Sequence, residues 1–108
     1  MRVAEWLDLH KRLCDEARAL SEKKGHDYSG TADTLANLKT CEAIGLCRAE
    51  IGILVRLTDK FKRLAVLIGS GEAPQNEPIH DTILDVLNYT LLLAAVLEEQ
   101  AATPCPKP

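Results

Sequence analysis

The chain has 108 residues, which corresponds to one domain, with a formal net charge of −3 and a sequence pI near 5.6. This acidic balance argues against general nucleic-acid binding and against attachment to an anionic membrane surface. No signal peptide is visible, because Arg2, Glu5 and Asp8 already stand in the first turns, and we expect a cytoplasmic protein.

The first predicted helix covers residues 3–24, where two lysines and Gly25 indicate its end. Its apolar stripe has spacings of three and four and consists of Trp6, Leu9, Leu13, Ala17 and Leu20. Residues 25–30 (GHDYSG) have the composition of a loop. A solvated turn and a binding loop are equally favoured there, and His26 and Tyr28 are the candidate ligand contacts.

A shorter helix is predicted for residues 31–44, before Gly45, and it carries Asn37 beside a weak apolar stripe. A second long helix follows at residues 48–68. Its apolar seam repeats at spacings of three and four and consists of Leu54, Leu57, Phe61, Leu64 and Ile68. Next to this seam lie four charged residues, Arg56, Asp59, Lys60 and Arg63, within roughly 100° of arc.

The last long helix is predicted from Pro78, which suits a first helical position, to about residue 100. It is apolar around most of its circumference, yet Asp81, Asp85 and Asn88 fall within roughly 60° of arc. Carboxylates on a helix that neighbours must bury require a metal ion, a cationic side chain or a proton as partner. The apolar run 91–97 is too short to span a bilayer, so we expect no membrane association.

The connector 69–76 is short enough to make the two long helices antiparallel neighbours. We therefore predict an all-α fold, a small bundle in which an N-terminal helix and a shorter helix pack against two long antiparallel ones. The domain should cover residues 1–101, and the proline-rich tail 102–108 is expected to be disordered. Leucines point in several directions from the last helix, which predicts a homo-oligomer.

Antiparallel pairing places the polar residues late in the 48–68 helix opposite the polar residues early in the last helix. The predicted cluster contains acids that could hold Mg²⁺ or Mn²⁺ (Asp59, Glu77, Asp81 and Asp85) and cations that could hold phosphate (Arg56, Lys60 and Arg63). Asn88 and Tyr89 lie nearby. The same spacing also fits a plain ion-pair network, with Asp81 and Asp85 paired to Arg56 and Lys60, and such networks are the commoner cause.

The four cysteines are Cys14, Cys41, Cys47 and Cys105. None pairs as C-x-x-C and none has a histidine at zinc-binding spacing, so we expect unreactive thiols in a reducing compartment.

Four blocks in order, residues 24–28 (KGHDY), 35–37 (LAN), 52–64 (GILVRLTDKFKRL) and 81–89 (DTILDVLNY), resemble a phage and bacterial family. It is called nucleotide modification associated domain type 1, and it is similar to the all-α nucleoside triphosphate pyrophosphohydrolases of the MazG group. The resemblance covers about residues 23–97. It implies a helical, Mg²⁺-dependent nucleotide-binding protein of a bacterium or a phage-infected host cell.

The resemblance also implies roles for single residues. Asp59 and Asp85 would be catalytic acids, and Asp85 matches the acid of the last E-x-x-D helix. His26, Tyr28, Asn37, Asn88 and Tyr89 would contact base or sugar. Two departures stand out: Thr82 replaces the glutamate of E-x-x-D, and Arg56 replaces the first acid of E-x-x-E on the preceding helix.

Three hypotheses follow from the sequence. The first is an Mg²⁺-dependent nucleoside triphosphate pyrophosphohydrolase, and the second is a protein that binds a nucleotide or a cyclic-nucleotide signal without turnover. The third is a structural helical oligomer whose polar stripe is an ion-pair network.

Overall fold

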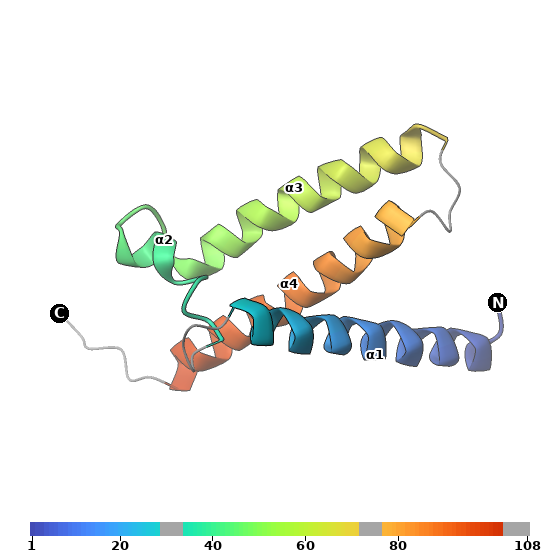
Figure 1. Ribbon diagram of the computed structural model, residues 1–108, viewed down its shortest axis with the longest axis horizontal. Helices are drawn as coiled ribbons and strands as arrows, with labels where there is room; N and C mark the ends of the chain where they lie inside the picture. Colours follow the sequence, from blue (N-terminus) through green and yellow to red (C-terminus); the bar gives the residue numbers. More distant parts are fainter. Residues whose placement is uncertain (29–33, 72–76, 103–108) are drawn as a thin grey trace.

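The computed structural model describes residues 1–28, 34–71 and 77–102 (Figure 1). Four helices appear in them: α1 (Val3–Tyr28), α2 (Thr40–Ala43), α3 (Ala49–Gly69) and α4 (Glu77–Ala102). These residues contain no strand, which confirms the predicted all-α class. The predicted tail 102–108 lies outside the described residues except for its first position, where α4 ends.

Helix α4 is the element against which the others are arranged. It runs alongside α3 in the antiparallel sense, and α1 crosses it on another side, as Figure 1 shows. The shared core is small and consists of Leu35, Leu38, Ala49, Ile53, Leu57 and Val96. Partly buried residues between Val86 and Ala95 of α4 pack against it. Because α3 and α4 pair along their lengths, every polar residue on their facing sides must find a partner within the interface.

The two long helices begin and end close to their predicted positions, but the first two predicted helices need correction. Helix α1 continues through Gly25 to Tyr28, because a glycine inside a helix costs only about 1 kcal/mol and does not force a stop. Among the described residues 34–44 of the second predicted helix, only Thr40–Ala43 are α-helical, and residues 34–39 form turns. Gly45 does end this segment, with φ of 81°, as expected for a glycine after a helix.

The face that α3 presents to α4 is rotated from the predicted seam. Ile53 and Leu57 are 1% and 7% exposed, whereas Leu54, Phe61 and Ile68 are 45%, 55% and 62% exposed. The buried stripe keeps Leu57 of the predicted seam and otherwise lies one residue away, so three of the five predicted seam residues are on the surface. An apolar stripe along α3 is therefore left without a partner in one copy of the chain.

Helix α4 is also long and apolar enough to cross a membrane by length and composition alone, with a mean hydropathy of 1.3 over the best window. The sequence argument considered only the leucine-rich run 91–97, and the absence of membrane association stays a prediction. Core helices of helical bundles satisfy the same criterion, so it does not by itself place α4 in a bilayer.

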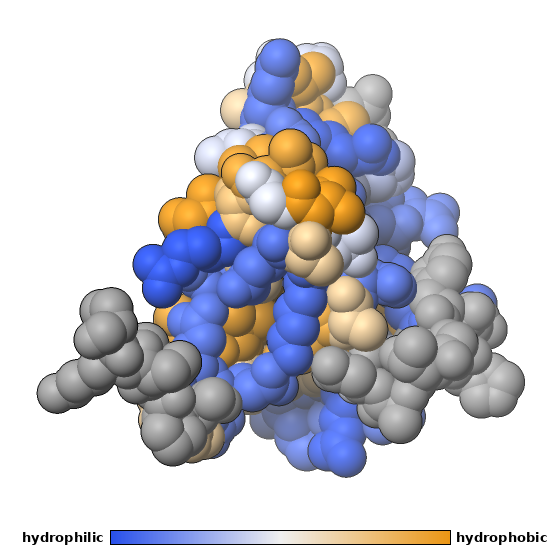
Figure 2. All heavy atoms as spheres, turned by 90° about the vertical axis from the view of Figure 1, so that its left-hand side faces the viewer, coloured by the Kyte–Doolittle hydropathy of each residue, from blue (hydrophilic) through white to orange (hydrophobic). Residues whose placement is uncertain are grey.

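Apolar side chains are also visible on the α2 end of the surface in Figure 2, where Ile44 and Leu46 are largely exposed.

Candidate functional site: a cationic hollow between α3 and α4

A shallow hollow of about 430 Å³ lies against the middle of α3 and opens to solvent. It is lined by four charged residues of α3 and by one aromatic residue of α4: Arg56, Asp59, Lys60, Arg63 and Tyr89. The four α3 residues are the charged group singled out beside the predicted seam. Three cationic side chains face one carboxylate, a formal surplus of two positive charges in a chain whose net charge is −3.

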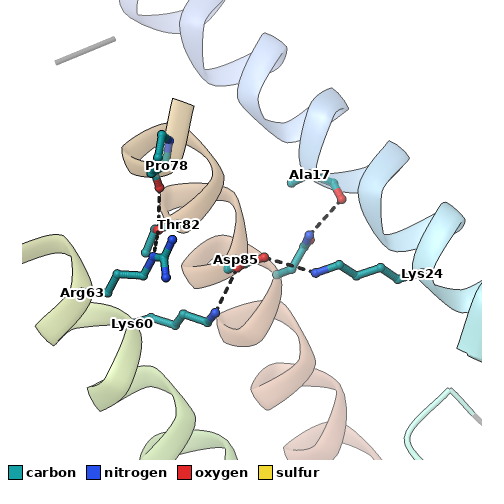
Figure 3. A network of polar contacts seen from close by, with 8 residues as sticks. Ala17, Lys24, Lys60, Arg63, Pro78, Thr82 and Asp85 are labelled. Atoms are coloured by element: carbon teal, nitrogen blue, oxygen red, sulfur yellow. Dashed lines mark hydrogen bonds and ion pairs between the residues drawn. The ribbon is translucent and has the colours of Figure 1, made fainter. Parts of the chain in front are cut away.

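Asp85 of α4 supports one wall of this hollow by joining three helices. Its Oδ2 lies 3.2 Å from Nζ of Lys60 on α3, and its Oδ1 lies 3.3 Å from Nζ of Lys24 on α1. Figure 3 shows the two lysines approaching the carboxylate from different helices. The side chain of Asp85 is only 21% exposed, so two charge-assisted contacts compensate for most of its desolvation.

Thr82, one turn before Asp85, fixes the position of Arg63. Its hydroxyl donates to the carbonyl of Pro78 at 2.6 Å and accepts from Nε of Arg63 at 3.2 Å (Figure 3). Thr82 is 2% exposed, so both contacts are protected from water. The E-x-x-D motif given above has a glutamate at this position. In this chain the hydroxyl of Thr82 stands there and holds Arg63 at the hollow.

Arg56 and Asp59 are exposed, and they differ from Lys60 and Arg63 in their contacts. Within the described part of the chain, neither forms a side-chain hydrogen bond or ion pair. An exposed guanidinium at the rim of a hollow keeps all its donors for a ligand, and guanidinium binds phosphate in a bidentate manner. The hollow therefore combines two anchored cations, Lys60 and Arg63, with one that has no partner.

The predicted metal ligands do not gather in the same way. Both carboxylate oxygens of Asp85 contact lysines, while Glu77 and Asp81 are exposed at the start of α4. Among residues 1–28, 34–71 and 77–102, no three His, Cys, Asp or Glu side chains converge as a metal would require. Lysines neutralise both oxygens of Asp85 here, so a Mg²⁺ ion at Asp85 would have to displace one of them, and metal binding stays a prediction.

The residues proposed to contact base or sugar are dispersed. Tyr89 lines the hollow, whereas Asn88 points to α1 and donates from Nδ2 to the carbonyl of Ala17 at 3.0 Å. Asn37 is exposed, away from the residues that line the hollow. The side chains of His26 and Tyr28 lie outside the described residues.

Sequence analysis missed two polar contacts between α1 and α4. Lys24 was interpreted as a helix-ending residue and as part of the KGHDY block, with no partner assigned, and it pairs with Asp85. His80 Nε2 lies 2.7 Å from Oε2 of Glu16. The basic end of α1 was a visible signal, but periodicity within one helix cannot show which neighbour a side chain will reach.

No family model, no curated protein and no solved structure matches this chain. The family resemblance therefore depends on the four sequence blocks given above.

Proposed function

We propose that this chain is a nucleotide-binding protein whose hollow between α3 and α4 takes the phosphate groups. The observation that carries the proposal is the excess of cations around the hollow, three against one carboxylate, beside Tyr89. Phosphate oxygens match guanidinium and ammonium donors in charge and geometry, and an aromatic ring can stack on a base. The order of sequence blocks supports the same ligand class.

In the proposed complex each cation has a distinct part. Arg63, held by Thr82, and Lys60, held by Asp85, provide preorganised positive charge, which lowers the entropy lost on binding. Arg56 closes on the phosphates from the rim. Lys24 neutralises the second oxygen of Asp85, so that the carboxylate repels an incoming anion less.

The test is a binding panel of nucleoside mono-, di- and triphosphates and inorganic pyrophosphate, measured by calorimetry in EDTA and again with Mg²⁺. Arg56→Ala should weaken phosphate-dependent binding about tenfold or more, because a charge-assisted hydrogen bond contributes about 1.5–3 kcal/mol. Lys62→Ala is the matched control: it removes one positive charge from an exposed residue of α3 that does not line the hollow. Equal effects of the two substitutions, or no nucleotide bound at all, would contradict the proposal and favour the structural hypothesis.

A second candidate is the Mg²⁺-dependent pyrophosphohydrolase that the resemblance implies. One observation favours it: Asp59 lies in the hollow among the cations, where a carboxylate could contact a metal–phosphate complex. A bound metal would supply charge neutralisation and an acidic water. Product analysis after incubation with Mg²⁺ or Mn²⁺ distinguishes the candidates. Release of pyrophosphate, lost in Asp59→Asn, supports the enzyme, and recovery of intact nucleotide supports binding alone.

A further inference from the structure

The turn between α2 and α3 brings two cysteines together. After α2, Leu46 N donates to the carbonyl of Cys41 at 2.9 Å and Gly45 N donates to that of Glu42 at 3.0 Å. These two bonds, with Gly45 at φ of 81°, form the helix-ending turn known as the Schellman motif. Cys47 N then donates to the same Cys41 carbonyl at 3.3 Å, so the reversed chain lies directly beside Cys41.

Gly52 of α3 provides the space in which both sulfur atoms lie. A Cβ at this position would be 2.9 Å from Sγ of Cys41 and 3.8 Å from Sγ of Cys47. Both thiols therefore lie against the same stretch of α3 backbone, at Gly52. Both residues are half-buried and reduced in this structure, so small reagents can still reach them.

We propose that Cys41 and Cys47 are a modification site, at which an intramolecular disulfide forms by exchange with a small-molecule disulfide such as oxidised glutathione. The thiolate of one cysteine attacks the small disulfide, which gives a mixed disulfide and releases one small thiol. The thiolate of the other cysteine then attacks the protein sulfur, which forms the Cys41–Cys47 bond and releases the second small thiol. The two electrons lost by the protein thiols are those gained by the small disulfide.

The surroundings of the pair determine how fast this exchange proceeds. The hydrogen bond with Cys41, followed by burial and the charges of Cys41, Glu42 and Glu50, raises the pKa of the Cys47 thiol. A raised pKa lowers the thiolate fraction at neutral pH, so the exchange should be slow there and faster as pH increases. The proximity of the sulfurs acts on the second step, because ring closure competes with attack by another small thiol.

The experiment follows the bond in the wild-type chain and in a Cys14→Ser/Cys105→Ser variant that keeps only the pair. Each protein is equilibrated across ratios of reduced and oxidised glutathione, quenched with acid and digested. Cleavage after Glu42 separates the two cysteines, so their peptides stay joined only through a disulfide. We expect the joined peptides in both proteins, and in the folded variant at a ratio about tenfold more reducing than in the same variant unfolded in urea.

Adding Cys47→Ser to the variant is the matched control, which can form only a mixed disulfide with glutathione at Cys41. The proposal is overturned if the folded protein carries glutathione on both cysteines without joined peptides. It is equally overturned if the cysteines link different chains, or if folding gives no advantage over the unfolded chain.

Discussion

At the scale of single residues, the hollow depends on buried contacts that hold its cations. Thr82 is the clearest case, because its one hydroxyl accepts from Arg63 and donates to Pro78 with almost no exposure to water. Asp85 does the same for Lys60 through charge. The spacing of the sequence predicted the pairing of Asp85 with Lys60, and the structure confirms it. The role of Thr82 was not visible there, because Thr82 only marks a missing glutamate.

Thr82→Val tests this role with little change in shape. We expect a loss of about 1–2 kcal/mol in the free energy of unfolding, because Arg63 loses a partner beside the core and a buried carbonyl keeps only its helical bond. Nucleotide affinity should also fall, since Arg63 is no longer held. Thr90→Val is the control: Thr90 makes the same kind of bond, to the carbonyl of Val86 at 2.8 Å, but is exposed and holds no cation. Similar losses in the two variants would refute the anchoring role.

At the scale of helices, sequence periodicity predicted α3 and α4 well and their relative rotation poorly. An isolated helix pattern shows that an apolar stripe exists, but α3 has apolar residues at adjacent positions, such as Ile53 and Leu54. Which of the two faces α4 depends on the shape and polarity of the α4 surface. In the structure Ile53 is the buried one. The predicted pairing of the polar faces of α3 and α4 still holds, because Lys60 is partly buried and reaches Asp85.

The far ends of α3 and α4 are joined by Glu50 and Gln100, whose amide donates to the Glu50 carboxylate. That hydrogen bond, the backbone N–H of Glu50 and the charge of Arg48 lower the pKa of Glu50 below its ordinary value of 4.5. A lowered folded-state pKa adds stability above the unfolded-state pKa, and that stability is lost as pH falls through the folded-state pKa.

Unfolding of wild type and Glu50→Gln should therefore be compared between pH 7 and pH 3. We expect wild type to have the larger free energy of unfolding at pH 7. The difference between the two proteins should shrink to zero as the pH falls below the ordinary pKa of glutamate. Glu98→Gln removes the same charge from an exposed position of α4 and controls for net charge. A gap that stays constant down to the lowest pH would show that the contact does not depend on ionised Glu50.

At the scale of the whole molecule, one copy of the chain leaves much apolar surface uncovered. The stripe of Leu54, Phe61 and Ile68 is exposed on α3, and Trp6 of α1 is half exposed. We predict that a second copy covers the α3 stripe, since exposed patches of this kind are rare on monomers. Sequence analysis expected an oligomer from α4, whereas the structure shows the larger exposed stripe on α3.

Phe61→Ser should then shift the sedimentation of the purified protein from an oligomer to a monomer at micromolar concentration. Removing a buried phenylalanine from an interface costs about 3–5 kcal/mol, enough to lower affinity more than a hundredfold. Lys62→Ser, at the neighbouring exposed position, should leave the oligomer unchanged. A wild-type chain that sediments as a folded monomer would rule out the predicted interface.

The central claim is that cations, with Asp85 as their internal counter-charge, bind phosphate in this hollow. Asp85→Asn tests it most directly, with Asp81→Asn as a control because Asp81 is exposed on the same helix and has no side-chain contact with the described residues. Measured by calorimetry in EDTA, nucleoside triphosphate affinity should rise about fivefold in Asp85→Asn, because the gain from removing a competing anion outweighs the loss of the contact that positions Lys60. The affinity should change less in Asp81→Asn. Binding that requires Mg²⁺ in wild type and disappears in Asp85→Asn would contradict the claim, because Asp85 would then be a metal ligand.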